Sequence, residues 1–165
     1  MNIEVYRDNK LFFNKKEYKC SLGRNGITKD KKEGDGSTPA GCFYIRKILY
    51  RKDKVKKPIT SLPTEEIKKN DGWCDDVSND NYNKQIKLPS ALSHENLWRN
   101  DDLYDIVAVV GYNDNPPIKK LGSAIFIHIA GPNYSPTAGC VGLSKEDLLK
   151  ILRNFGPKDK ICIKL

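Results

Sequence analysis

The chain has 165 residues, a length that suits one domain with a real hydrophobic core. Hydrophobic residues make up 38% of it and no apolar run is long enough to cross a bilayer, which excludes a disordered chain and a membrane-spanning helix. The net charge of +8 would attract a polyanion, but the basic residues are spread along the chain, as on an ordinary solvated surface.

Two features of the sequence bear on the compartment. The first 13 residues lack the basic head, apolar centre and cleavage site of a signal peptide, so we expect a cytoplasmic protein. The periplasm or cell envelope is the alternative if an export signal precedes residue 1. The number of cysteines is odd and no two are close together, which favours reduced thiols over a disulfide framework; they are Cys20, Cys42, Cys74, Cys140 and Cys162.

Strands dominate the first 50 residues. Alternating apolar residues predict a hairpin over 3–13 with its turn at Asp8-Asn9, then a strand over 18–22. Asp-Gly and Thr-Pro turn signals fill 33–41, and 42–50 is the next predicted strand. The Gly-Asp-Gly group around Asp35 lacks the further acidic ligands of a calcium loop, so we expect a turn and no metal there.

The middle of the chain gives weaker signals. Residues 51–70 are predicted as a basic loop with a short helix near 64–69, capped by Thr64. Residues 71–76 are predicted as an irregular loop that Trp73 fixes to the body. Ser93 followed by Glu95 suggests the start of a short helix.

The last third contains the strongest signals. Dense apolar runs predict buried strands over 104–112 and 123–129. Ser144 is a good helix N-cap, and a helix with one apolar face follows it as far as Gly156-Pro157. A strand over 161–163 closes the chain. We therefore expect a single α+β domain, mostly β, over residues 1–165.

The segment from 123 to 143 carries the chemistry. His128 ends an apolar strand, a Gly/Pro/Ser loop follows, and Cys140 stands directly after Gly139, where the backbone can approach another molecule. These are the parts of a nucleophile pair, in which a thiolate attacks and an imidazole moves the proton. The alternative is an inert buried thiol and a core histidine.

Two blocks of the sequence resemble the YkuD family of L,D-transpeptidases, the cysteine enzymes of bacterial cell-wall metabolism. Residues 34–43, GDGSTPAGCF, resemble the family's GDG-x-TP-x-G-x-F block, and His128 with 137–141, TAGCV, resembles its His…[Ser/Thr]-x-Gly-Cys-[Ile/Val] block. With 71–76 and 93–99, the resemblance covers nearly the whole chain. It implies twisted mixed sheets, similar to a β-sandwich, with one helix after the catalytic cysteine.

The resemblance also implies roles for single residues. Cys140 would be the nucleophile and His128 the base, oriented by a backbone carbonyl, while the N–H groups of Gly139 and Cys140 would form the oxyanion hole. Thr137 would hydrogen-bond within the loop. Three positions depart from the family pattern, which bears on substrate contact: Ala138, Gly142 and Ile129 stand where the family often has His, Arg or Asn, and Gly.

The implied reaction is acyl transfer without a cofactor. Cys140 would attack the L-centre carbonyl of a peptidoglycan stem tetrapeptide, release the terminal D-Ala, and hold a thioester. An amine acceptor gives a 3–3 cross-link, whereas water gives L,D-carboxypeptidase activity on muropeptides. The lack of a signal peptide favours water and the family favours an amine, so both stay open. Carbapenems are the expected β-lactam inhibitors.

The sequence offers further candidate substrate contacts and two other classes of function. Tyr134, His94, Arg99 and Trp73, with Thr137, are candidate substrate contacts, although each has a structural reading as well. A zinc protein could use Cys74, His94, His128 and Cys140, but the usual ligand spacings are absent. A nucleic-acid-binding module has only the positive charge in its favour, without a motif.

Overall fold

The computed structural model describes residues 1–165, which form three sheets and one α-helix. The strands of the large sheet are β1 (Ile3–Tyr6), β2 (Lys10–Phe13), β3 (Lys16–Lys19), β6 (Gly41–Tyr50), β7 (Thr64–Glu66), β11 (Ile106–Val110), β12 (Phe126–Ile129), β13 (Val141–Leu143) and β14 (Lys160–Ile163). The small sheets contain β8 (Asp71–Cys74), β9 (Gln85–Lys87) and β10 (His94–Asn96), and β4 (Ile27–Thr28) with β5 (Thr38–Pro39). The helices are α1 (Lys145–Asn154) and the short 3₁₀ helix η1 (Pro132–Tyr134). The predicted mostly-β fold with mixed sheets and a single α-helix is confirmed.

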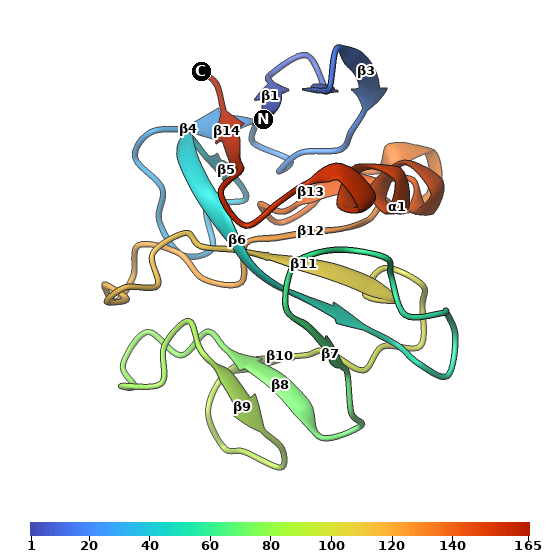
Figure 1. Ribbon diagram of the computed structural model, residues 1–165. Coiled ribbons are helices and arrows are strands. Elements are labelled where there is room, and N and C mark those ends of the chain that lie inside the picture. Colours follow the sequence, from blue (N-terminus) through green and yellow to red (C-terminus); the bar gives the residue numbers. More distant parts are fainter.

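Strand β6 is the centre of the large sheet. It is ten residues long and curves through the molecule, so that one half pairs with β14 and the other half with β11 (Figure 1). The order of the sheet is β13-β12-β11-β6-β14-β1-β2-β3, with β7 beside β6. The β12–β13 and β1–β14 pairs are parallel and their neighbours antiparallel, which makes the sheet mixed. α1 supplies the crossover between β13 and β14.

The two ends of the large sheet meet. Ser21, just after β3, forms an antiparallel bridge with Gly142 in β13, and each residue donates its N–H to the other's carbonyl. A Cβ atom at Gly142 would overlap Ser21 Oγ and lie 3.1 Å from the Cα atom of Ala130, so glycine suits this close approach. The bridge gives the outer edge of β13 a hydrogen-bonded partner at Gly142.

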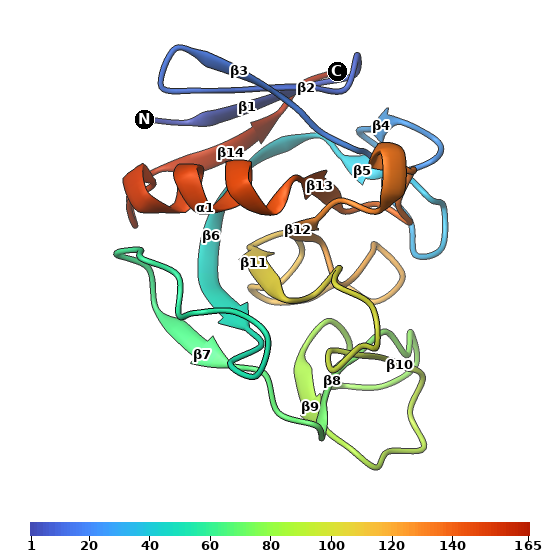
Figure 2. The same ribbon diagram turned by 90° about the vertical axis from the view of Figure 1, so that its right-hand side faces the viewer.

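Two hydrophobic cores lie on the two faces of this sheet. The larger one lies between α1 and the strands of the sheet, the N-terminal hairpin among them, and includes Ile48, Leu148 and Phe155. The smaller one packs the β8–β10 sheet against β11 and β12, around Trp73 and Phe126. The β8–β10 sheet therefore forms a layer of its own below β11 and β12 (Figure 2).

Helix α1 begins where the sequence predicts. Ser144 Oγ accepts a hydrogen bond of 3.1 Å from the N–H of Asp147, and the helix ends at Asn154, before Gly156-Pro157. Leu148, Leu152 and their apolar neighbours along one face are buried against the sheet. No helix of the structure is long and apolar enough to span a membrane.

Replacing Ser144 by alanine is expected to destabilise the protein by about 1 kcal/mol, because the first turn of α1 loses its side-chain acceptor. Urea unfolding followed by circular dichroism measures the change. The variant Ser144→Asp keeps an acceptor and should retain the stability of the unmodified chain. Equal losses in the two variants would show that the cap contributes nothing.

Three predictions for the middle of the chain were wrong. The helix expected near 64–69 is strand β7, the loop expected over 71–76 contains β8, and the helix start expected at Ser93 precedes β10. In each case pairing with a distant segment overrides the local signal: β7 runs parallel to β6, and β10 pairs with β8. The strands that pair with β7, β8 and β10 lie outside the short windows of sequence on which these predictions were based.

The expectation of reduced thiols was wrong for one pair. Cys42 and Cys162 form a disulfide, although 120 residues separate them. The antiparallel register of β6 and β14 places the two cysteines directly opposite each other. Spacing along the chain could not show this proximity, because the sheet alone creates it. Cys20, Cys74 and Cys140 are free and buried.

Candidate active site

His128 and Cys140 line the same cavity, which has a volume of about 400 Å³. The reason lies in the sheet: β12 and β13 are parallel neighbours, with His128 opposite Gly142. Cys140 directly precedes β13, so the loop from 130 to 140 returns the chain to the level of His128. Two residues twelve positions apart in the sequence therefore face one cavity.

The imidazole of His128 is buried and held by the backbone. Its Nδ1 lies 2.8 Å from the carbonyl oxygen of Ile129. A carbonyl can only accept, so Nδ1 carries the hydrogen and Nε2 is left as the basic nitrogen. This is the backbone orientation that the family resemblance implies. Burial lowers the pKa of His128 below its ordinary value, which keeps the ring neutral near pH 7.

Tyr104 supports the His128 ring from the side. The two rings lie 5.5 Å apart in an edge arrangement, and the Tyr104 hydroxyl donates a 2.8 Å hydrogen bond to Glu95 Oε1. The guanidinium of Arg99 lies over the Tyr104 ring at 5.0 Å. Burial raises the pKa of the Glu95 carboxyl and that of Tyr104. Tyr104 and Glu95 both line the cavity and carried no functional signal in the sequence.

The Cys140 thiol is protonated in this arrangement. Its Sγ donates to the carbonyl oxygen of Ala124 at 3.2 Å and accepts from the N–H of Phe126 at 3.3 Å. Burial raises the pKa of the thiol to about 12, the charge of Glu95 adds to this, and the charge of Lys31 opposes it. The site therefore rests as a thiol beside a neutral imidazole, without the preformed thiolate that a nucleophile pair suggests.

No hydrogen bond joins His128 to Cys140, since the thiol is bonded to Ala124 instead. Catalytic hydrogen bonds are often long or misaligned without substrate and form in the complex. Turning the S–H bond from the Ala124 carbonyl to His128 Nε2 is thus the first movement that catalysis by this pair requires.

Thr137 fixes the turn that carries Cys140. Its Oγ1 donates to the carbonyl oxygen of Cys140 at 2.6 Å and accepts from the N–H of Gly139 at 3.1 Å. Gly139 has φ +146, and a Cβ atom there would lie 2.7 Å from the Ser37 carbonyl oxygen, so the turn requires glycine.

These contacts revise the expected oxyanion hole. The N–H of Gly139 is already used by Thr137, whereas the N–H of Cys140 makes no hydrogen bond within the protein. Of the two predicted donors, only Cys140 N–H is free to bind an oxyanion. Sequence could not separate the two, because the choice depends on where the Thr137 side chain turns.

The Gly-Asp-Gly block reaches the same site from the other side. Asp35 accepts hydrogen bonds from the N–H groups of Lys32 and Ser37 and from Lys31 Nζ, at 2.8, 2.9 and 2.5 Å respectively. These bonds make Asp35 a structural turn residue. Lys31 is almost fully buried, and its Nζ lies 3.6 Å from the position of a Cβ atom on Gly139. Lys31 lines the cavity and was not singled out in the sequence.

The five candidate substrate contacts divide into two groups. Thr137 and Arg99 line the cavity, and the Arg99 guanidinium is paired with both oxygens of Asp101. Tyr134, His94 and Trp73 do not line it.

Each of these three side chains has another environment. Lys19 Nζ lies over the Tyr134 ring at 4.7 Å, at the end of η1. The Nδ1 atom of His94 is bonded to its own chain at Leu92 O. Trp73 is buried in the smaller core, where it packs edge-on against Phe126.

The zinc alternative has no geometric support. No three His, Cys, Asp or Glu side chains lie together as ligands of one ion would. Cys74 is buried in β8, and His94 stands opposite it in β10, apart from the cavity that His128 and Cys140 share.

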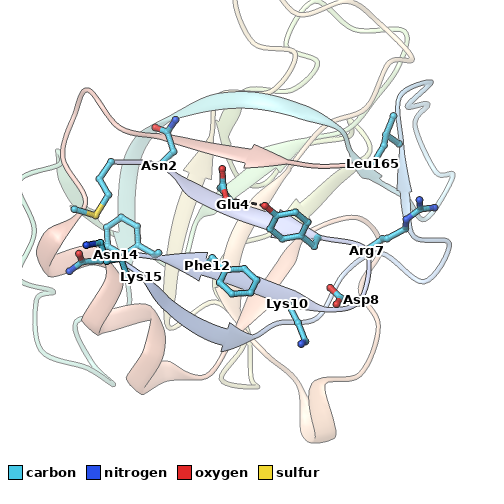
Figure 3. A pocket seen from close by; sticks show the side chains of 12 residues that line it. Asn2, Glu4, Arg7, Asp8, Lys10, Phe12, Asn14, Lys15 and Leu165 are labelled. Carbon is cyan, nitrogen blue, oxygen red and sulfur yellow. Dashed lines mark hydrogen bonds between the residues drawn. The ribbon is translucent and has the colours of Figure 1, made fainter.

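A wider hollow lies far from the Cys/His pair. It has a volume of about 860 Å³ and covers the outer face of β1 and β2 (Figure 3). Tyr6 and Phe12 pack edge-on there, and Arg7, Lys10 and Leu165 are at its border. No cysteine or histidine lines this hollow, so it offers no comparable chemistry.

The comparison with known families assigns the chain to a family. The YkuD family model, the L,D-transpeptidase catalytic domain, matches residues 1–163. The chain belongs to the YkuD family. No curated protein and no solved structure matches it. YkuD domains are enzymes of the L,D-transpeptidase family, and their substrate is peptidoglycan. The match contains His128, Cys140 and the whole cavity of this YkuD domain.

Proposed function

We propose that this YkuD domain cleaves the bond between the third residue and the terminal D-Ala of a peptidoglycan stem tetrapeptide, with Cys140 as nucleophile and His128 as base. The observation that carries the proposal is that Cys140 and His128 line one cavity, and that the N–H of Cys140 makes no hydrogen bond within the protein. A nucleophile, a base and an oxyanion donor are the minimum for acyl transfer.

The first half of the reaction forms a thioester. The Cys140 proton passes to His128 Nε2 while the sulfur attacks the L-centre carbonyl carbon, and the Cys140 N–H donates to the resulting oxyanion. The tetrahedral intermediate then collapses, the C–N bond breaks, and His128 returns the proton to the leaving D-Ala amine. The N–H of Phe126 already donates to Sγ and stabilises the negative charge as it develops there.

The acceptor decides the second half. With an amine, the thioester gives a 3–3 cross-link and the enzyme is an L,D-transpeptidase. With water, it gives a tripeptide and the enzyme is an L,D-carboxypeptidase. Both acceptors need His128 Nε2 as base, so the transfer and hydrolysis reactions share one set of residues. We take amine transfer as the first reading and hydrolysis as the second.

Incubation with a disaccharide tetrapeptide, followed by mass spectrometry, tests the function. A tripeptide product identifies water as the acceptor, and a cross-linked dimer identifies an amine. If neither product nor free D-Ala forms, the proposed function is wrong.

A carbapenem is expected to add covalently to Cys140. Its strained β-lactam amide is an acyl donor, which the thiol can attack as it attacks the stem peptide. The intact mass of the protein should rise by the mass of one inhibitor molecule. The Cys74→Ala variant is the matched control and should still form the adduct, since Cys74 lies outside the cavity. An adduct that survives in Cys140→Ala would place the reactive thiol elsewhere.

The rate is expected to fall in acid solution and to stay level through neutral and mildly alkaline pH. Burial lowers the pKa of His128 from its ordinary value, so kcat/KM should fall only on the acid side, as the base becomes protonated. Burial raises the pKa of the Cys140 thiol to about 12. Ionisation of the thiol should therefore cause no change in kcat/KM between about pH 7 and 9. A rise centred near pH 8 or 9 would instead indicate that the thiol must ionise before attack.

A further inference from the structure

Arg24 lines the catalytic cavity and has no partner for its charge. The side chain is exposed and takes part in no hydrogen bond and no ion pair. Arg99, the other arginine of the cavity, donates Nε and Nη2 to Asp101 at 2.8 and 2.6 Å. Lys31 is neutralised by Asp35 at 2.5 Å. Among the cations of the cavity, Arg24 is therefore the one available to a ligand.

The backbone of Arg24 is joined to the nucleophile loop. Its N–H donates to the carbonyl oxygen of Thr137 at 2.9 Å, and the N–H of Thr137 donates to the carbonyl oxygen of Leu22 at 2.9 Å. Gly23 and Thr137 form a parallel bridge. Thr137 is bonded in turn to Cys140, so two steps of hydrogen bonding fix the Arg24 backbone relative to the nucleophile.

The guanidinium itself is placed by a glycine. A Cβ atom on Gly36 would lie 2.8 Å from Arg24 Cζ, so the side chain packs directly over the Gly-Asp-Gly turn. This contact requires Gly36, whose φ is +67. A guanidinium packed on one face still presents its N–H edge, which is the geometry for binding a carboxylate through two bonds.

The other charges of the cavity already have partners or are negative. On the β4–β5 side, Lys31 is paired with Asp35 and Glu33 accepts hydrogen bonds from Tyr82 and Ser123, while Asp75 and Glu95 come from the β8–β10 layer, on the opposite side of β12 (Figure 2). A negatively charged group of a ligand is therefore favoured at the Arg24 guanidinium.

We propose that Arg24 binds the terminal carboxylate of the leaving D-residue and so selects stem peptides that end in a free carboxylate. This inference rests on the proposed function. The carboxylate lies one residue beyond the carbonyl that Cys140 attacks, so it must sit close to the nucleophile loop, where Arg24 is fixed. The Arg24 guanidinium binds it in two charge-assisted hydrogen bonds and orients the scissile carbonyl toward Sγ.

A two-by-two experiment tests the proposal. The unmodified enzyme and Arg24→Ala are each given a disaccharide tetrapeptide and its analogue with a terminal D-alaninamide, and release of D-Ala or D-alaninamide is measured. We expect kcat/KM for the acid to fall by about 10- to 100-fold in Arg24→Ala. The unmodified enzyme should turn over the amide with a similarly low kcat/KM, and Arg24→Ala should not lower kcat/KM for the amide further.

Two control variants sharpen the result. Arg24→Lys keeps the charge but loses the two-bond geometry, so its kcat/KM for the acid should be intermediate. Arg7→Ala removes the same charge from the remote face of β1 and β2, where it lines the wider hollow, and should leave both substrates unchanged (Figure 3). If Arg7→Ala and Arg24→Ala lose kcat/KM for the acid substrate equally, the net charge of the protein explains the effect and the proposal is overturned.

Failure of this inference is distinct from failure of the proposed function. If Arg24→Ala lowers kcat/KM for the acid substrate and for the amide substrate by the same factor, Arg24 contacts some other part of the stem and the inference is wrong. Unchanged turnover of the acid overturns it as well. If the unmodified enzyme releases no D-Ala at all, the proposed function fails first, and the carboxylate role falls with it.

Discussion

Replacing Cys140 by alanine is expected to abolish D-Ala release from a disaccharide tetrapeptide, with a loss of at least about 10⁴-fold in kcat. The thioester cannot form without the sulfur, and no other cysteine lines the cavity. Free D-Ala and tripeptide, measured by mass spectrometry, report the loss. Water activated by His128 would give only a small residual rate.

The control for this variant is Cys74→Ala. Both thiols are buried and free, so the two substitutions remove the same atom from the interior at similar cost to stability. Circular dichroism and thermal unfolding should show that both variants are folded. A folded Cys140→Ala variant that releases D-Ala at the unmodified rate would refute the assignment of the nucleophile.

Replacing His128 by glutamine is expected to reduce kcat by about 10²- to 10⁴-fold, because the amide cannot take the thiol proton. The loss should depend on pH in a way that a structural defect would not. Burial raises the pKa of Cys140 to about 12, so the variant must lose this proton to solvent. Its rate should rise about tenfold per pH unit from neutral to alkaline solution.

Tyr104→Phe is the matched control for the base. It keeps the ring that packs edge-on against His128 and removes only the hydroxyl that donates to Glu95. We expect a small change in kcat and the acid-side pH dependence of the unmodified enzyme. A pH-independent loss in His128→Gln, or an equal loss in Tyr104→Phe, would mean that His128 acts through packing and not as a base.

Several elements were predictable because their signals are local. Helix α1 follows from the Ser144 cap and one apolar face, and β11 and β12 follow from dense apolar runs. The pairing of His128 with Cys140 followed from residue types and from the family resemblance. Neither the local elements nor the His128 and Cys140 pair depends on the residues that line the other side of the cavity.

The elements that were missed depend on distant partners. Strands β8 and β10 exist because they pair with each other and cover Phe126 with Trp73, whereas their own residues carry turn and cap signals. The Cys42–Cys162 disulfide depends in the same way on the register of β6 and β14. The spacing of residues along the chain determines neither the register of two strands nor the order of strands in a sheet.

The sequence by itself determined the two candidate groups: a thiol on a glycine turn and an imidazole at the end of a buried strand. Only the tertiary structure decided their state. Burial and the charge of Glu95 keep the Cys140 proton in place, and Thr137 occupies one of the two expected oxyanion donors. The tertiary structure also leaves Arg24 without a partner. Proton affinity and free hydrogen-bonding capacity depend on groups that folding brings together from distant parts of the chain.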